Sequence, residues 1–274
     1  MKRSWIAYPY IVWMIIFIVV PLLLILFYSV TVMTPTGTEI SLSNFGRFMD
    51  PIYVVVLVRS ITLALISTLL CLFLGYPVAM ILAGKDFNRK NTMILLFVIP
   101  MWMNFLLRTY AWMSLLEKTG LINRALSFLG LPNLNLLYNN EAVVLGMVYN
   151  FLPFMVLPIY SVLSKVDKSI VEAAEDLGAN SLTVFRKVTF PLSLPGVVSG
   201  ITMVFMPAVT TFVISRLLGG GQYMLVGNLI EQQFLSVNDW NFGSAISIIM
   251  MVLILISMGI MSRYETEQGG GGLW

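Results

Sequence analysis

The chain has 274 residues, of which 58% are hydrophobic and 11% charged, and its mean hydropathy is +0.90. A soluble core of this size could not cover so much apolar surface, so the composition excludes a soluble globular protein and predicts an integral membrane protein. The absence of histidine excludes Ser-His and Cys-His nucleophile pairs and histidine-ligated metal sites. The net charge of +3 does not indicate nucleic acid, because the basic residues lie at the ends of apolar runs, as topology signals do.

Apolar runs long enough to cross a membrane occur six times along the chain. A helix needs about 20 residues to span a hydrocarbon core roughly 30 Å thick. Lys2 and Arg3 precede the first run as they would in a signal peptide, but the run is too long for one and no small-residue cleavage site follows, so we expect a retained span. The sequence therefore predicts an all-α, polytopic membrane protein with six transmembrane helices, at residues 8–32, 61–83, 92–116, 142–163, 195–218 and 242–261.

The distribution of Lys and Arg about these runs predicts the orientation. Ten of the 16 fall on the side of the N-terminus and six on the other, and an excess of basic residues is typical of the cytoplasmic side. We therefore expect the N- and C-termini in the cytoplasm, residues 34–59 folded over the outer face, and an amphipathic helix within residues 119–130 at the outer interface. The ten are Lys2, Arg3, Lys85, Arg89, Lys90, Lys165, Lys168, Arg186, Lys187 and Arg263, and the six are Arg47, Arg59, Arg108, Lys118, Arg124 and Arg216.

Three of the spans carry polar and aromatic side chains that could line a substrate path. In the third span we expect Arg108 to reach the outer interface and Asn104 to face a cavity or a partner helix, because an unpaired buried amide is costly. In the fifth span such residues follow Pro207, at which we expect the helix to break. The same side chains would equally suit ordinary helix packing. The candidate path residues are Trp102, Asn104, Tyr110, Tyr149, Asn150, Phe154, Thr210, Thr211 and Phe212.

The longest polar interruption between apolar runs predicts two short helices joined by a turn. We expect Asp167 to cap the first helix, Gly178 to end it and Ser181 to cap the second. Phe190-Pro191 is expected to end the second helix before the next apolar run begins. Helix geometry by itself leaves open whether this segment is a solvated connector or a docking element.

The spacing within this segment resembles the cytoplasmic signature E-A-A-x3-G-x9-I-x-L-P of permease subunits of ABC importers. Val188 and Phe190 stand where that signature has Ile and Leu, and both remain apolar. The matching residues are Glu172, Ala173, Ala174, Gly178 and Pro191. The resemblance implies contact with a partner ATPase through Glu172, Ala173, Ala174, Asp176 and Gly178.

Four further stretches are L-G-Y-P at 74–77, I-P-M-W-M-N at 99–104, N-F-L-P-F-M-V at 150–156 and D-W-N-F-G at 239–243. They resemble the spermidine/putrescine importer permease, the first of its two permease subunits, and the similarity covers most of the chain. This resemblance implies a type I ABC importer permease fold. It places an N-terminal transmembrane helix and external loop at residues 1–58, a permease domain at 59–263 with the coupling region at 165–194, and a flexible tail at 264–274.

The resemblance also implies partners and a mechanism. The partners are a second permease subunit, two cytoplasmic ATPase subunits and an extracytoplasmic polyamine-binding protein, assembled in a bacterial cell membrane, and the mechanism is uptake by alternating access. No P-loop sequence occurs in the chain, so we expect ATP and Mg²⁺ to bind to the partner ATPase. This chain is then a transport subunit, with no cofactor, catalytic residue or metal site of its own.

Other functions remain open from the sequence. An importer of another small solute, such as an amino acid or an opine, would carry the same coupling signature. An autonomous channel or secondary transporter would be expected to show an internal repeat and intramembrane ionisable pairs, and neither feature occurs. A membrane enzyme is disfavoured, because the chain has no nucleophile-base pair.

Overall fold

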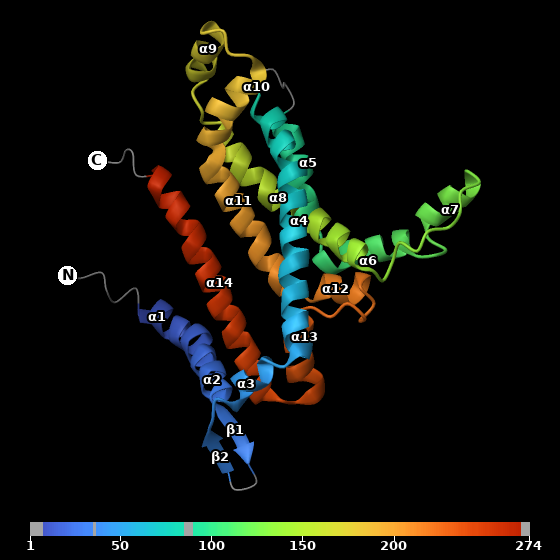
Figure 1. Cartoon of the computed structure of the whole chain (residues 1–274), viewed down its shortest axis with the longest axis vertical. Helices are drawn as coiled ribbons and strands as arrows, with labels where there is room; N and C mark the ends of the chain where they lie inside the picture. The colour runs from blue at the N-terminus through green and yellow to red at the C-terminus, as the bar shows by residue number, and fades with distance from the viewer. Residues whose placement is uncertain (1–7, 35–36, 85–89, 270–274) are drawn as a thin grey trace, which may run out of the picture. The chain divides into compact units, whose positions relative to one another are not determined.

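The computed structural model describes residues 8–34, 37–84 and 90–269. Of the residues used above, Lys2, Arg3, Lys85, Arg89 and the end of the tail at 270–274 lie outside this part of the chain. The described chain is mostly helical and divides into two compact units (Figure 1). Unit 1 is Met1–Val58 with Val226–Ile256, and unit 2 is Arg59–Leu225 with Ser257–Trp274.

Each of the six predicted spans has a helical counterpart. Five stretches are long and apolar enough to cross a membrane as continuous helices, and a sixth consists of two helices bent by 93° at a short break. The prediction of six spans is confirmed when this bent pair counts as one span. The five are Tyr8–Ser29, Pro51–Ala83, Asn140–Leu163, Ser181–Thr210 and Trp240–Met261, and the bent pair is Thr92–Trp102 with Phe105–Phe128.

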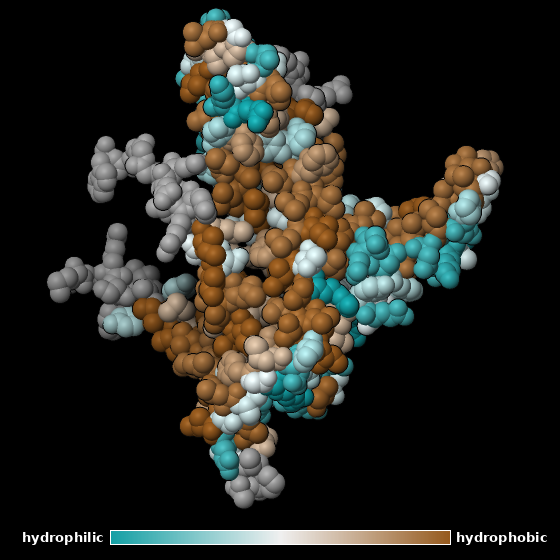
Figure 2. Space-filling view, viewed as in Figure 1, coloured by the Kyte–Doolittle hydropathy of each residue, from teal (hydrophilic) through white to brown (hydrophobic). Residues whose placement is uncertain are grey.

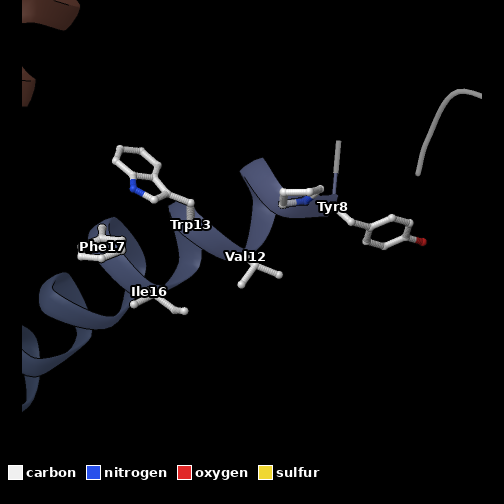
Figure 3. A pocket seen from close by; sticks show the side chains of 6 residues that line it. Tyr8, Val12, Trp13, Ile16 and Phe17 are labelled. Atoms are coloured by element: carbon white, nitrogen blue, oxygen red, sulfur yellow. The ribbon is translucent and has the colours of Figure 1, made fainter. Parts of the chain in front are cut away.

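Unit 1 begins with an apolar helix that the rest of the chain leaves uncovered. The most apolar part of this span is 0% buried. Figure 3 shows Trp13 and Phe17 projecting from one side of the helix, and Val12 and Ile16 from the other. A helix that is apolar all round suits lipid or a neighbouring transmembrane helix. It comprises α1 (Tyr8–Met14), the π-helical turn η2 (Ile15–Val19) and α2 (Val20–Ser29).

The connection after α2 is tied by hydrogen bonds to the start of the last helix. The side-chain amide of Asn241 donates to the carbonyls of Tyr28 and Thr31, at 3.1 and 2.7 Å, and to Thr31 Oγ1 at 3.0 Å. Arg47 Nη1 lies 2.7 Å from Asp239 Oδ2. The connection thus gains a short antiparallel hairpin that the sequence did not predict, within a chain that is otherwise helical as expected.

The elements of this part of unit 1 are β1 (Thr31–Thr34), paired with β2 (Gly37–Ile40) so that Thr31 faces Ile40, then α3 (Ser43–Phe48), α13 (Val226–Gln232), the π-helical turn η4 (Gln233–Val237) and α14 (Trp240–Gly269), which continues into unit 2.

Unit 2 is held together by close packing between long helices. A Cβ added to Gly196 of α11 would lie 2.9 Å from the carbonyl oxygen of Pro158 in α8, and one added to Gly200 would lie 2.8 Å from Met155 Sδ. A third helix, α4, packs on α8, where Ser67 Oγ donates to Met147 Sδ at 3.3 Å. Small residues at such contacts let membrane helices approach closely enough to gain van der Waals packing.

The elements of unit 2 are α4 (Pro51–Ala83), which begins in unit 1, then α5 (Lys90–Trp102), α6 (Phe105–Leu116), α7 (Leu121–Phe128), α8 (Asn140–Leu163), α9 (Lys168–Asp176), α10 (Ser181–Val184), the π-helical turn η3 (Phe185–Thr189), α11 (Phe190–Thr210) and α12 (Val213–Leu218).

The third span breaks between α5 and α6, because Asn104 starts a new helix. The ψ angle of Asn104 is 126°, outside the helical region, and its side-chain oxygen accepts a hydrogen bond from the Leu106 N–H at 2.8 Å. Asparagine is a preferred N-cap for this reason. Asn104, which was expected to face a cavity or a partner helix, is exposed in this chain, and its side-chain oxygen is satisfied locally. Arg108, which was expected to reach the outer interface, is 9% exposed in this chain.

The fifth span breaks at Thr211, and the break expected at Pro207 is wrong. Pro207 lies inside α11, and the chain becomes extended only at Thr211, where ψ is 138°. The residues from Thr210 to Val213 are β-branched or aromatic and therefore weak helix formers. The hydroxyl of Thr210 also donates to the Met206 carbonyl at 3.2 Å, a side-chain bond that competes with continuation of the helix.

Candidate functional site

The turn between α9 and α10 is closed by two capping devices. The Asp167 side chain accepts a hydrogen bond from the Ser169 N–H at 3.0 Å, which confirms the predicted cap at the start of α9. At the other end Gly178 has a φ of +81°, and the Gly178 and Ala179 N–H groups donate to the carbonyls of Glu175 and Ala174, at 2.8 and 3.1 Å. This pair of bonds is the Schellman motif, which favours glycine at the position of positive φ. Gly178 therefore ends α9 as predicted.

The second helix of this segment differs from the prediction at both ends. Its cap is Asn180, whose side-chain oxygen accepts from the Thr183 N–H at 2.9 Å, and Ser181 is the first helical residue. Phe190-Pro191 does not end it, because the helix runs on from Ser181 to Thr210. A proline lacks an N–H and crowds the carbonyl four residues earlier, and the widened turn η3 directly before Pro191 accommodates both effects. The predicted coupling region at residues 165–194, called the coupling segment below, is thus continuous with a membrane span.

The residues expected to contact an ATPase lie on the surface of this segment. Glu172, Ala173, Asp176 and Gly178 are exposed, and Ala174 is half-buried. Leu177 is 89% exposed. Figure 2 shows hydrophilic residues at the end of unit 2 that carries α9 and α10, whereas hydrophobic residues cover the neighbouring span helices. The structure therefore brings these five residues together on an accessible helix and turn.

A buried tyrosine of α4 anchors this segment to the membrane core of unit 2. The ring of Tyr76 lies 5.7 Å from that of Phe185 and 5.8 Å from that of Phe190. The hydroxyl groups of Tyr76 and Ser193 are 2.8 Å apart, and Ser193 donates to the Phe190 carbonyl, so Tyr76 is the donor to Ser193. Aromatic contacts of this kind add stability beyond the area that they bury.

Tyr76 is not among the residues predicted from the sequence, although a tyrosine inside an apolar run indicates a buried hydroxyl that needs a hydrogen-bond partner. The cluster also gives Phe190 a role. The aromatic ring at this position, where the family signature has leucine, forms two of the three ring contacts in the cluster. The cluster thus connects the segment that follows the α9–α10 turn to α4 as well as to α11.

A cavity of about 570 Å³ lies between α5, α8 and α11. Most of its lining is apolar, the hydroxyl-bearing residues are Ser161 and Ser199, and no carboxylate takes part. Phe154, one of the nine predicted path residues, contributes to the lining. The lining residues are Met101, Phe154, Leu157, Pro158, Ser161, Val162, Gly196, Ser199 and Met203.

The other predicted path residues of α8 and its neighbours are not all available to a solute. The Tyr149 ring packs edge-on against Trp112 at 5.3 Å. Asn150 is 2% exposed and donates to the Gly146 carbonyl at 2.9 Å, while its Oδ1 has no partner among the described residues. Asn150 is therefore part of the helix packing of unit 2.

The remaining predicted path residues lie at or near the two breaks. Trp102 ends α5 and is 80% exposed, Asn104 caps α6, and Tyr110 is exposed on α6. Thr210 ends α11, and Thr211 and Phe212 form the break before α12. Discontinuous helices at membrane depth occur where the backbone lines a cavity or is covered by protein. These positions thus concentrate at the two places where backbone polar groups leave regular helix.

Comparisons with known proteins place the chain in a family. Residues 75–266 match the family described as binding-protein-dependent transport system inner membrane component. The chain is 38% identical over 254 residues, 91% of each chain, to the spermidine/putrescine transport system permease protein PotB of Escherichia coli (strain K12). It is 36% identical over 258 residues to the protein of the same name from Haemophilus influenzae, with 92% of this chain and 90% of that one covered.

Solved structures share the fold. A bacterial alginate ABC transporter in complex with an alginate pentasaccharide-bound periplasmic protein contains a chain that matches with a TM-score of 0.81 and 16% identity, over 99% of this chain and 98% of that one. The MetNI methionine ABC transporter, in an inward-facing conformation, matches with a TM-score of 0.55 and 16% identity, over 78% and 94%. At this identity the likeness is one of fold. The family match and the sequence identity together show that the chain is a membrane permease that belongs to the binding-protein-dependent transport system inner membrane component family.

Proposed function

We propose that this chain is a membrane-spanning permease subunit of an ATP-driven ABC importer that takes up polyamines, spermidine or putrescine, by alternating access. The observation that carries this proposal is the 38% identity to a spermidine/putrescine permease across 91% of both chains. Identity of this extent covers the spans, the breaks and the coupling segment alike. The proposed complex contains this chain, a second permease subunit, two cytoplasmic ATPase subunits that bind ATP and Mg²⁺, and an extracytoplasmic polyamine-binding protein.

The coupling segment is the proposed contact with the ATPase. Three carboxylates, Glu172, Glu175 and Asp176, are exposed along α9, and Leu177 projects beside the turn. An acidic helix with an exposed apolar end suits a partner groove that has basic residues at its rim and an apolar floor. This arrangement supports roles for Glu172, Ala173, Ala174, Asp176 and Gly178 in coupling, with both termini of the chain on the same, cytoplasmic side.

The cavity beside Phe154 supports a path for an elongated cation. A polyamine has apolar methylene segments between its ammonium groups, and the lining offers apolar side chains, one aromatic ring and the hydroxyl of Ser161. Because no carboxylate lines the cavity, this chain would hold the solute weakly, as passage requires, with stronger acceptors left to the partners. The other predicted path residues, apart from the buried Asn150, are proposed as the rest of this path; they are Trp102, Asn104, Tyr110, Tyr149, Thr210, Thr211 and Phe212.

The test is ATP hydrolysis by the complex that co-purifies with this chain, reconstituted in proteoliposomes. The extracytoplasmic protein is added empty, or loaded with spermidine, putrescine or an amino acid. We expect stimulation by the polyamine-loaded protein alone. Stimulation by the amino acid instead would retain the importer and refute the polyamine, and the absence of a co-purifying ATPase would refute the importer.

A further inference from the structure

Arg108 is a charged side chain in the buried face of a helix. On α6 the residues that turn inward recur at helical spacing, with Thr109 0% exposed, Leu116 4% exposed, and Phe105 and Trp112 half-buried. Arg108 lies in the middle of this stripe and is 9% exposed. The Trp112 ring contacts Tyr149 of α8, so the stripe is packed against another helix. Nine-tenths of an arginine side chain is therefore enclosed by its own chain.

This arginine has no counter-charge among the residues that the structure describes. Its Nε is buried without an acceptor, and no ion pair of the described residues includes it. A guanidinium cannot lose its proton in a protein, so burial cannot be relieved by neutralisation. Removal of one charge from water without a partner is among the most costly arrangements in a protein interior, and ionisable groups in membrane spans are ordinarily paired.

The described carboxylates of this chain do not supply a counter-charge to Arg108. Among the acids of unit 2 that the structure describes, the two closest in sequence to Arg108 are Glu117 and Glu141, and both are exposed. In unit 1, Asp239 is paired with Arg47, and Glu231 also has an interaction partner. Among the described residues no carboxylate pairs with Arg108, so a counter-charge can be supplied by another protein.

The chemistry around Arg108 restricts what that outside group can be. The proposed polyamine substrate is a cation and would be repelled, so the counter-ion is not the solute. The exposed side of α6 is apolar, with Leu106, Leu107 and Tyr110 45%, 64% and 46% exposed, and such a face suits contact with another transmembrane protein. A carboxylate of that protein would have to reach the Nη1 and Nη2 atoms of Arg108, since of the guanidinium nitrogens only Nε is buried without a partner.

We propose that Arg108 forms an ion pair with a carboxylate of the second permease subunit, and so fixes which permease assembles with this chain. This inference rests on the proposed function, because it needs the heteromeric complex. A buried pair of this kind contributes to partner choice more than to raw affinity, since any partner without the matching acid leaves a guanidinium buried and unpaired.

The experiment uses the full complex, with an affinity tag on this chain and the second permease quantified after purification across a series of salt concentrations. Arg108→Gln removes the charge, Arg108→Lys retains it, and Arg124→Gln is a matched control, since Arg124 is exposed on α7. Each acidic residue of the second permease is then replaced singly by Asn or Gln, with and without Arg108→Gln. The amount of inserted chain is measured for every variant.

We expect Arg108→Gln to lower retention of the second permease by at least about tenfold, Arg108→Lys to lower it less, and the control to leave it unchanged. One acid of the second permease should reproduce the loss, with no further loss in the double variant. Exchange of the two charges, Arg108→Glu with that acid replaced by Arg, should restore retention even if Arg108→Gln inserts poorly.

Three results would overturn the pair. They are additive losses for every acid of the second permease, coupling in the same double-variant test to Glu117 or Glu141 of this chain instead, or loss of a bound phospholipid in native mass spectrometry with retention unchanged. If Arg108→Gln is neutral while polyamine still stimulates ATP hydrolysis, only the pair is refuted. If the wild-type chain retains no second permease, the proposed assembly fails, and the pair fails with it.

Discussion

Gly178 permits a sharp test of the coupling turn, because the structure separates backbone strain from steric contact. Its φ is +81°, and a Cβ added at this position would meet no atom within 4 Å. Replacement by alanine therefore adds no clash within this chain, and its whole cost comes from the left-handed backbone conformation. That cost is about 1–2 kcal/mol for a residue other than glycine. It would reduce the population of the closed turn by about 5- to 30-fold.

The loss of ATP-driven uptake should depend on which residue replaces Gly178. Asparagine tolerates the left-handed conformation better than alanine, so Gly178→Asn should preserve more ATP-driven uptake than Gly178→Ala. Gly178→Asp has the tolerance of asparagine but places a negative charge at the C-terminal end of α9, which costs about 0.3–1 kcal/mol more and also changes the surface offered to the ATPase. Uptake into proteoliposomes is measured per inserted complex, so that loss of insertion does not count as loss of coupling.

Gly130 supplies the matched control. It follows α7 with a φ of +74° and no atom within 4 Å of an added Cβ, and the Gly130 and Leu131 N–H groups donate to Ser127 and Leu126 carbonyls at 3.1 and 2.9 Å. This is the same motif at a turn outside the coupling segment. Equal defects in Gly130→Ala and Gly178→Ala would show that the loss reflects general strain. Unimpaired uptake in Gly178→Ala would refute the requirement for the turn.

Substitutions at three further positions test the anchor, the helix contact and the cap. Tyr76→Phe should lower the free energy of unfolding by about 1 kcal/mol, because the hydrogen bond to Ser193 is lost. Tyr76→Leu should lower it by about 1 kcal/mol more for each of the two ring contacts that Tyr76 makes. Equal thermal stability of the two purified variants would contradict the ring cluster. Gly196→Ala should lower thermal stability by about 1–3 kcal/mol, because its Cβ meets α8 backbone, whereas Gly259→Ala, with open space around it, should not; a neutral Gly196→Ala would argue against the close α8–α11 contact. Asn180→Ala should lower stability by about 1 kcal/mol and expose the Thr183 amide to hydrogen exchange. Ser181→Ala should leave that amide protected. The reverse result would make Ser181 the cap.

Short-range features of this chain could be predicted from the sequence because their causes are local. Apolar runs of sufficient length determine membrane helices wherever the hydrocarbon core is the solvent. Asp167 starts α9 and Gly178 ends it, through hydrogen bonds and a backbone conformation that involve only neighbouring residues. The spacing from Glu172 to Pro191 likewise identified the importer class without any knowledge of packing.

Tertiary structure decided the features that depend on two distant segments or on competition between nearby caps. Asn180 rather than Ser181 caps α10, and the helix continues through Pro191, because a widened turn absorbs a proline that would otherwise end it. Tyr76 finds its partners 109 to 117 residues further along the chain, a separation that no local pattern encodes. Arg108 was expected at the outer interface, and its burial in the stripe of α6, the helix that begins after the bend at Asn104, could not be predicted from local sequence. Hydropathy measures whether a side chain prefers water or an apolar environment, whereas its burial depends on the direction that the helix takes.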